Sequence, residues 1–422
     1  MTAGLLGDRV RALRSDALVR NSVLLLVSTV VVAAGGFVFW QIAARLFTPE
    51  DVGRTSALIT ASALIANLAL LGMQNSVIRF LHDWDDRATT MNSAVTVVTI
   101  ASVAGAAVFV AGVRWVAPEL ALLHRPGNAV LFVVFTASLA LTLLNDNVFI
   151  ALQRSGHVAG RNTATVALRL GLPFACAGMG AFGLFTAYQS AATLALVAYL
   201  VVLHRELGLR TRLRLDTARI ATMWRYSAGN YVATVLLLLP PLVMPNLVTH
   251  SLGPAQAAYY YIASLIAGVL TFVPQATARS LFAQASVDPA GLHASLRRVV
   301  ALTAAAQAPA LLLIVAAGPF VLGLFGPAYA QAYPLLVVLS IGAALASVGF
   351  VGNTLMLIAG RLRLMCALTG AAAVVIIGGA YAFGDRGLLW IGGSLLAGEL
   401  LLAVTYTPVI ARMGRAAAEA SR

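Results

Sequence analysis

Three charged residues lie inside long apolar stretches of this chain: Asp146, Arg169 and Glu399. A charged side chain at the centre of a membrane helix costs about 2.5–3.5 kcal/mol on insertion scales, so each one requires a physical explanation. Asp146 and Arg169 are predicted at similar depths on neighbouring antiparallel helices, and we expect them to form an ion pair. Such a pair can fix helix packing or act as a gate or relay, and the sequence leaves both roles open.

Glu399 has different surroundings, because no charged residue lies within one or two helical turns of it. A carboxyl group isolated near the middle of a membrane is expected to be protonated or in contact with water. Glu399 is therefore the best single candidate for proton coupling. The alternative is a neutral side chain that hydrogen-bonds to a neighbouring helix.

Other polar residues could bind a ligand directly. Arg45, Arg79 and Arg279 lie near helix ends, where a guanidinium can grip a phosphate or an acidic sugar through two hydrogen bonds. Arg79 and Arg279 also fit ordinary interfacial placement, whereas Arg45 falls on the opposite side of the membrane. Amides within the apolar stretches could bind sugar hydroxyls or hold helices together; they are Gln41, Asn67, Gln74, Asn75, Asn145, Asn147, Asn246, Gln275 and Asn353.

The elements that must position these residues are membrane-spanning helices. Of the 422 residues, 60% are hydrophobic and 10% are charged, which excludes a water-soluble fold. About twelve apolar stretches are each close to the roughly 20 residues that a helix needs to cross a bilayer, and about twice as long as a barrel strand. The expected spans are residues 21–45, 55–80, 91–116, 128–153, 162–183, 185–204, 227–250, 257–282, 298–323, 329–359, 362–383 and 388–411. We therefore predict an all-α integral membrane protein.

The basic residues predict the orientation of these spans. The net charge of +13 comes from residues in short loops rather than on one face of a soluble domain, which argues against a nucleic-acid partner. Most arginines fall in alternate loops, and the opposite loops hold only Arg45, Arg54, Arg114, Arg125 and Arg386. This asymmetry predicts a multi-pass protein of the cytoplasmic membrane with both termini inside and residues 1–20 as a cytoplasmic arm.

The longest loop divides the chain into two similar halves. We predict a six-helix bundle over residues 1–204, a basic cytoplasmic linker over 205–225 and a second six-helix bundle over 226–422. At a shift of about 205 residues Gly35-Gly36 aligns with Pro240-Pro241, and Thr48-Pro49 aligns with Gly253-Pro254. This match favours parallel repeats related by a pseudo-two-fold axis along the membrane normal.

Glycine and proline interrupt the corresponding first and seventh helices. Interruptions at matching positions of two repeats point to the binding site of a transporter, although membrane helices also tolerate these residues generally. Proline removes a backbone donor and is expected to bend or unwind the seventh helix. We predict a hinge that comprises Gly35, Gly36, Pro240, Pro241 and Pro245.

No motif in the chain indicates an enzyme. The sequence contains no Walker loop, dinucleotide fingerprint, nucleophile elbow or zinc-ligand spacing, so ATP hydrolysis is not expected. His157, and His82 with its neighbours Asp83, Asp85 and Asp86, are interpreted as solvated loop residues. Cys176 and Cys366 both fall in apolar spans and indicate neither a disulfide nor a metal site. We therefore predict no catalytic residues, no cofactor and no metal.

Two regions of the chain resemble a known family. The segment Ala43–Gly53, followed by a span that ends with Leu71–Phe80, is similar to the opening of Wzx-type polysaccharide flippases. Leu324–Tyr329 and Leu357–Arg361 resemble the second half of the same family. These flippases belong to the exporter superfamily that also contains multidrug antiporters and lipid II flippases.

The resemblance implies two six-helix bundles around a central cavity that opens alternately to each side of the membrane. The implied substrate is a lipid-linked oligosaccharide on an undecaprenyl-type carrier, moved from the inner to the outer leaflet. Its phosphates suit a cationic path, whereas a drug antiporter would be expected to show a more acidic cavity. We assign to this substrate cavity the residues Gln41, Arg45, Asn75, Arg79, Gln275 and Arg279.

Several alternatives stay open. Proton or sodium coupling is expected, with membrane lipid as a partner and the monomer as the functional unit. A multidrug antiporter and a lipid II flippase share the implied architecture. A polytopic membrane glycosyltransferase is an alternative from another class, with Glu50 and Asp51 as metal-binding or basic carboxylates, but the short outer loops argue against it.

Overall fold

The computed structural model describes residues 24, 27–81, 87–152, 154–207, 212, 214–287 and 291–420. These residues form helices joined by short connections, and the described part of the chain contains no strand. The predicted cytoplasmic arm of residues 1–20 and the loop residues His82–Asp86 lie outside the described residues.

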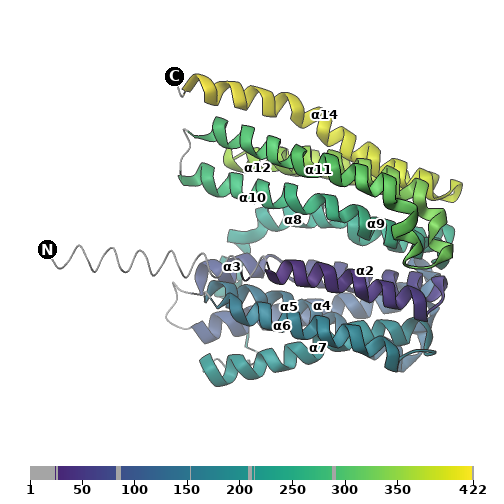
Figure 1. The fold of residues 1–422 in the computed structure, drawn as a ribbon. Coiled ribbons are helices and arrows are strands. Elements are labelled where there is room, and N and C mark those ends of the chain that lie inside the picture. Colours follow the sequence, from purple (N-terminus) through teal and green to yellow (C-terminus); the bar gives the residue numbers. More distant parts are fainter. Residues whose placement is uncertain are drawn as a thin grey trace. The chain divides into compact units, whose positions relative to one another are not determined.

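The helices follow one another with few residues between them (Figure 1). Among the described residues, eleven helices are long and apolar enough to cross a membrane, so the expected multi-pass architecture is confirmed at this level. The elements are Val27–Leu46, α2 (Pro49–Ala69), α3 (Met73–Phe80), α4 (Arg87–Val116), η1 (Pro118–His124), α5 (Pro126–Ala151), α6 (Ser155–Ala175), α7 (Gly180–Leu207), α8 (Thr217–Leu252), α9 (Pro254–Gly268), η2 (Val269–Thr271), α10 (Phe272–Val287), α11 (Leu292–Gly323), η3 (Pro327–Ala332), α12 (Tyr333–Ile358), α13 (Leu362–Phe383), η4 (Gly384–Arg386) and α14 (Leu388–Ala420).

The fifth expected span, residues 162–183, differs from the helix observed. Helix α6 begins earlier, at Ser155, and ends at Ala175. It is not among the eleven apolar helices, because its first half carries the polar run Arg161-Asn162-Thr163 and its second half carries Arg169. A search for apolar stretches misses the first turns of such a helix, since polar residues can continue a helix as well as apolar ones. The count of twelve spans stays a prediction.

The chain divides into two compact units, which we describe separately. Unit 1 comprises Met1–Leu46, Ile65–Val113 and Leu122–Ala228, and unit 2 comprises Phe47–Leu64, Arg114–Ala121 and Gly229–Arg422. Most of α2 thus packs with the second half of the chain, as the close approach of Gly53 to the Pro254 carbonyl illustrates. The repeat relation, the cytoplasmic termini and the predicted domain limits stay predictions.

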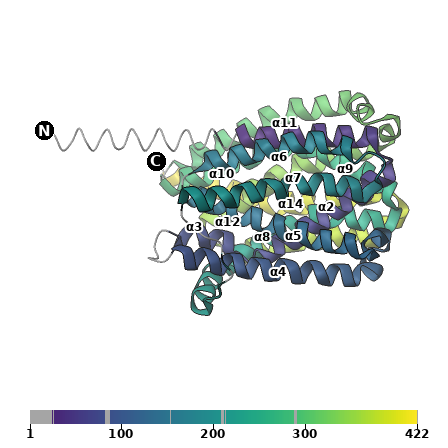
Figure 2. The same cartoon turned by 90° about the horizontal axis from the view of Figure 1, so that it is seen from below.

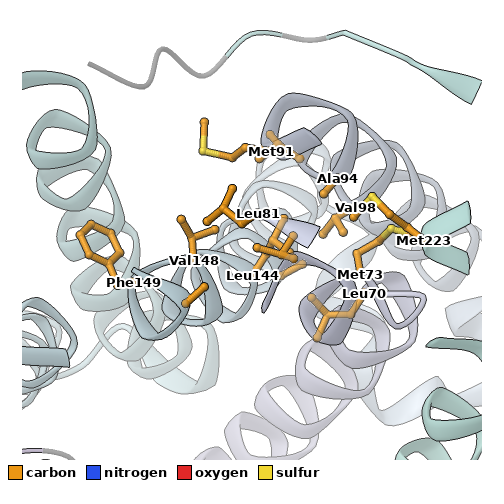
Figure 3. Packing of buried hydrophobic residues seen from close by; sticks show 14 of the residues in the cluster. Leu70, Met73, Leu81, Met91, Ala94, Val98, Leu144, Val148, Phe149 and Met223 are labelled. Atoms are coloured by element: carbon orange, nitrogen blue, oxygen red, sulfur yellow. The ribbon is translucent and has the colours of Figure 1, made fainter. Parts of the chain in front are cut away.

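The core of unit 1 forms where α3, α4 and α5 meet (Figure 3). The expected span 55–80 is broken in two, because Leu71 and Gly72 adopt φ angles of 47° and 78° between α2 and α3. The left-handed region favours glycine, and a chain that enters it leaves the helix. After the turn, Met73 and Val77 belong to the same buried cluster as Leu144 and Val148 of α5. Ser76 Oγ donates to the Met223 carbonyl oxygen at 2.7 Å.

Helices α5, α6 and α7 run alongside one another within unit 1 (Figure 2). The connection between α5 and α6 contains only residues 152–154, and that between α6 and α7 only residues 176–179. Short connections between antiparallel helices place residues at equal distances from the turn opposite each other. The positions of these two short connections therefore determine which polar side chains of α5, α6 and α7 lie opposite one another.

Two prolines in unit 2 are compensated by side chains from neighbouring helices. Proline at position i leaves the carbonyl of residue i−4 without its helical donor, and in a membrane that carbonyl needs another one. The carbonyl that Pro274 leaves open is that of Leu270, and Gln307 Nε2 of α11 donates to it at 3.0 Å. This break divides the expected span 257–282 into α9, η2 and α10.

The second case lies within α11. Pro319 leaves the Val315 carbonyl open, and Tyr333 Oη at the start of α12 donates to it at 2.9 Å. The Tyr333 ring fits there because residue 318 is glycine, at which an added Cβ would lie 2.8 Å from that ring. In unit 2, side chains of neighbouring helices therefore donate hydrogen bonds to backbone carbonyls that proline leaves without a helical donor.

Candidate functional site

Asp146 of α5 forms an ion pair with Arg161 of α6. Arg161 Nη2 lies 2.9 Å from Asp146 Oδ2, and the two side chains are 10% and 19% exposed respectively. The predicted pairing of Asp146 with Arg169 is therefore wrong in its partner. Arg161 lies just before the expected span 162–183, and the structure places it inside α6.

The early start of α6 explains this correction. Asp146 lies five residues before the end of α5, and Arg161 lies six residues after the start of α6. At 1.5 Å per residue both are about 8–9 Å from the short α5–α6 connection, whereas Arg169 is about 21 Å along α6. A start at residue 162 would have moved Arg169 opposite Asp146, which is the origin of the wrong prediction.

Further polar groups extend this pair into a network across four helices. Arg161 Nη2 donates to Asn162 Oδ1 at 2.5 Å, and Asn162 Nδ2 donates to Ser28 Oγ of the first helix at 2.7 Å. The guanidinium carbon of Arg161 lies 5.6 Å from the ring centroid of Tyr199 on α7. We call Ser28, Asp146, Arg161, Asn162 and Tyr199 the Asp146 cluster.

The Asp146 cluster contains unsatisfied polar atoms. Asp146 Oδ1, Arg161 Nε and Tyr199 Oη are buried and have no hydrogen-bond partner among the described residues. A buried unsatisfied group destabilises a fold by about 1–3 kcal/mol, so such groups call for a functional explanation. A carboxyl group beside a permanently charged guanidinium can take up a proton and thereby break the ion pair, or release it and re-form the pair. That chemistry suits a gate or a coupling site.

Arg169 occupies a separate position in unit 1. Its guanidinium carbon lies 3.6 Å from the ring centroid of Tyr188 on α7, and its Nε donates to the Tyr188 carbonyl oxygen at 3.2 Å. Tyr188 packs in turn on Phe39 and Trp40 of the first helix, with ring centroids 5.1 and 6.4 Å away. No carboxylate lies within ion-pair distance of Arg169 in the described part of the chain.

Glu399 lies on α14 in unit 2 and faces α12. An added Cβ at Gly349 would lie 4.0 Å from Glu399 Oε2, which shows how closely the carboxyl group approaches that helix. The Glu399 side chain is half-buried and has neither an ion pair nor a hydrogen bond with the described residues.

A polar contact between the same two helices lies about two turns along α14 from Glu399. Tyr406 Oη donates to Asn353 Oδ1 at 2.7 Å, and the Tyr406 ring fills the space left open by Gly352. Glycine at the contact lets the two helices approach closely, as is common in membrane bundles. This contact fixes the face of α14 that carries Glu399.

The residues assigned to the substrate cavity are distributed over both units. Gln41 and Arg45 lie on the first helix and Asn75 and Arg79 on α3, all in unit 1, whereas Gln275 and Arg279 lie on α10 in unit 2. The three arginines are exposed and the three amides are half-buried. Gln275 Nε2 donates to Thr271 Oγ1, one turn earlier, at 3.0 Å. A common cavity for all six residues stays a prediction.

The predicted hinge residues have well-defined surroundings. Gly35 allows close packing of the first helix on α6, because an added Cβ would overlap the Val166 side chain, while the space at Gly36 is open. Helix α8 continues without interruption through Pro240, Pro241 and Pro245, so the seventh expected span contains no unwound segment. A hinge role for these residues stays a prediction.

The sequence did not predict that Arg161 pairs with Asp146, nor that Arg161 and Arg169 lie over the rings of Tyr199 and Tyr188. The sequence spacing could have predicted the Asp146–Arg161 pair, because the two residues lie at nearly equal distances on either side of the short loop around Arg154. Tyr188 and Tyr199 gave no signal because an aromatic residue in an apolar helix is ordinary. The described residues contain no group of three His, Cys, Asp or Glu side chains that could hold a metal ion.

The fold is shared with known membrane transporters. A structure titled as the lipid II flippase MurJ in an inward closed conformation matches with a TM-score of 0.74 and 9% identity, over 93% of this chain and 87% of that one. An inward-facing multidrug resistance MATE family transporter of the MOP superfamily matches with a TM-score of 0.65 and 15% identity, over 96% and 100%. Its outward-facing counterpart matches with a TM-score of 0.62 and 13% identity, over 95% and 96%.

The sequence comparison gives the family. A search of curated proteins finds no matching sequence. The model of a family described as "Polysaccharide biosynthesis protein" matches residues 42–334, which is more than half of the chain. The similar structures are those of transporters and a flippase rather than enzymes. The chain therefore belongs to this polysaccharide biosynthesis family and has the fold of the MOP-superfamily transporters.

Proposed function

We propose that the chain is a secondary transporter that flips a lipid-linked oligosaccharide across the cytoplasmic membrane for cell-surface polysaccharide synthesis. The observation that carries this proposal is the family match over residues 42–334 on a chain with the fold of a lipid II flippase. A polysaccharide made from lipid-linked units needs a step that moves those units between leaflets. A flippase fold in a polysaccharide family fits that step.

Alternating access is the proposed mechanism. The similar solved structures include an inward-facing and an outward-facing transporter, so this fold supports both states in those proteins. In this chain the two predicted six-helix bundles would rock against each other, with Gly35, Gly36, Pro240, Pro241 and Pro245 as the hinge. The substrate would be bound by Gln41, Arg45, Asn75, Arg79, Gln275 and Arg279.

The embedded charges favour an anionic substrate over a cationic drug. Asp146 is already neutralised by Arg161, whereas Arg169 has no carboxylate partner among the described residues. A site for a cationic drug would need an unpaired acid; Glu399 is such an acid among the described residues, but it lies in unit 2 and we assign it to proton coupling. Proton or sodium coupling is assigned to Asp146 and Glu399, and the monomer is the proposed functional unit.

A complementation experiment tests this function. The gene would be deleted from a strain without a redundant homologue, and surface polysaccharide and intracellular lipid-linked oligosaccharide would be measured together. We expect loss of the surface polymer and accumulation of the lipid-linked precursor, both reversed by the plasmid-borne gene. Wild-type display of the surface polymer in the deletion strain would contradict the proposal. A new sensitivity to cationic drugs without a polysaccharide defect would redirect it to a multidrug antiporter.

A further inference from the structure

We infer that Arg169 binds a phosphate group of the lipid that the protein carries, and that Tyr188 positions its guanidinium for this contact. The inference rests on the proposed function and adds to it a residue and the chemical group that this residue recognises. Phosphate is the shared chemistry of two sources, the diphosphate of a polyprenyl carrier and the headgroup of an anionic phospholipid.

The geometry leaves one edge of the Arg169 guanidinium available. One face lies against the Tyr188 ring at 3.6 Å, and Nε is occupied by the Tyr188 carbonyl oxygen at 3.2 Å. A guanidinium has five N–H donors, of which four are on the two terminal nitrogens. Those nitrogens have no partner among the described residues, so the edge that suits bidentate binding of phosphate is unused.

The position of this guanidinium is not that of an arginine reaching for the membrane surface. Arg169 lies six residues before the end of α6, about 9 Å from it. Tyr188, which holds the guanidinium, lies eight residues after the start of α7, about 12 Å from the same end of the helix pair. The guanidinium is thus held at the same distance from this helix end as the Arg169 backbone, or farther from it. A snorkelling arginine would instead extend toward the nearer membrane surface.

The charge at this depth lacks a compensating acid. Asp146, the expected partner, is bound to Arg161 about two helical turns away along α6. A ring face and one carbonyl oxygen stabilise a cation without neutralising it. An uncompensated cation held rigidly by neighbouring helices of a lipid transporter is a binding site for a mobile anion.

The aromatic setting selects arginine over lysine. Tyr188 is itself held by Phe39 and Trp40 of the first helix, so the guanidinium plane is fixed by three residues from two other helices. A planar guanidinium stacks on a ring and offers a two-pronged edge, and an ammonium group does neither. Replacement by lysine would keep the charge and lose the geometry.

The test is direct binding to the full-length protein in a neutral lipid nanodisc. The probes are undecaprenyl diphosphate, undecaprenol, which lacks phosphate, and phosphatidylglycerol. For the wild type we expect tighter binding of the diphosphate than of undecaprenol. Arg169→Ala should weaken diphosphate binding about tenfold or more and leave undecaprenol binding unchanged, because it removes hydrogen bonds to a charged group.

Three further variants separate recognition from packing. Arg169→Lys should retain only part of the affinity, and Tyr188→Leu should weaken diphosphate binding while Tyr188→Phe keeps it, since the ring rather than the hydroxyl supports the guanidinium. The matched control is Arg114→Ala. Arg114 also lies over an aromatic ring, at 4.1 Å from Trp115, but this pair is exposed at a helix end. Its removal should change diphosphate affinity less than about twofold.

Each outcome decides the inference. Equal diphosphate binding by folded Arg169→Ala and wild type overturns it and leaves the proposed function standing, since that is judged by polysaccharide complementation. Arg169-dependent binding of phosphatidylglycerol alone supports phosphate recognition with the phospholipid as its source. Failure of the wild type to bind either phosphate probe better than undecaprenol overturns it. If Arg169→Ala does not fold, Arg169→Lys and Tyr188→Leu answer the same question.

Discussion

The Asp146–Arg161 pair illustrates how one buried contact depends on both of its members. The pair is largely removed from water, and Asp146 Oδ1 and Arg161 Nε are unsatisfied in the described structure. In such a setting the isolated partner of a broken pair is more costly than the pair itself. The stability of unit 1 is therefore expected to respond sharply to single substitutions and weakly to a double one.

We predict that Asp146→Ala destabilises the protein by about 3–5 kcal/mol, because it leaves the Arg161 charge buried without a counter-ion. The double variant Asp146→Leu/Arg161→Met should recover most of the loss. Thermal unfolding of the purified protein checks both expectations. The matched control is the more exposed pair of Asp216 and Arg219, for which Asp216→Asn should cost less than about 1 kcal/mol. Equal effects at the two pairs would contradict the argument.

A second prediction concerns the role of the Glu399 carboxyl group in proton coupling. If its carboxyl group carries the coupled proton, Glu399→Gln should abolish the dependence of export on a pH gradient while the protein remains folded. Polysaccharide export would be measured in cells or vesicles at two imposed gradients. Asn353→Ala provides a control on the facing helix α12, since it removes the contact with Tyr406 and leaves the carboxyl group. Unchanged export and unchanged gradient dependence in Glu399→Gln would remove Glu399 from the mechanism.

At the scale of the element, α9, η2 and α10 show how a broken helix is maintained. The Leu270 carbonyl, freed by Pro274, depends on the amide of Gln307. We predict that Gln307→Leu destabilises unit 2 by about 1–3 kcal/mol, because it leaves a buried acceptor unpaired. Gln284→Leu on the exposed face of α10 serves as the control and should be nearly neutral. Thermal unfolding measures the difference, and an equal response would argue against this role of Gln307.

The linker that follows α7 is bound to α4 by an unusual set of hydrogen bonds. The backbone N–H groups of Arg212, Arg214 and Asp216 donate to Asn92 Oδ1 at 2.8 Å, Thr96 Oγ1 at 2.9 Å and Ser93 Oγ at 3.2 Å. Donation by every second residue is typical of an extended chain. The predicted basic linker therefore contains a segment fixed to unit 1 by side chains of α4.

This contact predicts local rather than global effects. Thr96→Val removes the acceptor for the Arg214 N–H, and hydrogen exchange at residues 212–216 should become at least about fivefold faster, since a backbone hydrogen bond contributes about 1 kcal/mol. Thr99→Val is a matched control on the same helix, because Thr99 Oγ1 donates to its own helix at Val95. Unchanged exchange in Thr96→Val would show that the linker is held by other contacts.

In the molecule as a whole, the sequence predicted the membrane helices, which depend on the length of apolar stretches. It did not predict where helices break or which side chains meet, because these depend on exact helix ends. Long apolar stretches predicted a helical membrane protein correctly, because hydrocarbon leaves few alternatives. The breaks at Leu71-Gly72 and at Val269–Thr271 were missed, since glycine and proline occur in many unbroken membrane helices. Helix α8, which holds three prolines without interruption, shows that the same residues need not break a helix.

For the charged residues, too, the sequence predicted which ones lie within helices but not which residues they contact. Composition identified Asp146, Arg169 and Glu399 as costly, and the structure places all three on helices. The partner of Asp146 could not be predicted without knowing where α6 begins, and a shift of two turns moved its contact from Arg169 to Arg161. Because Asp146 pairs with Arg161, Arg169 has no acid within ion-pair distance among the described residues, which favours a role in binding an anion.

We propose that this protein moves a lipid-linked oligosaccharide between leaflets, and a flipping assay in proteoliposomes measures that movement itself. Purified protein would be reconstituted with a fluorescent lipid-linked oligosaccharide, and a membrane-impermeant glycosidase or quencher would report how much of it reaches the outer leaflet. We expect faster transfer than in empty liposomes, and we expect Arg169→Ala but not Arg114→Ala to slow it. Transfer no faster than in empty liposomes, with substrate from the native host and an imposed ion gradient, would contradict the proposal.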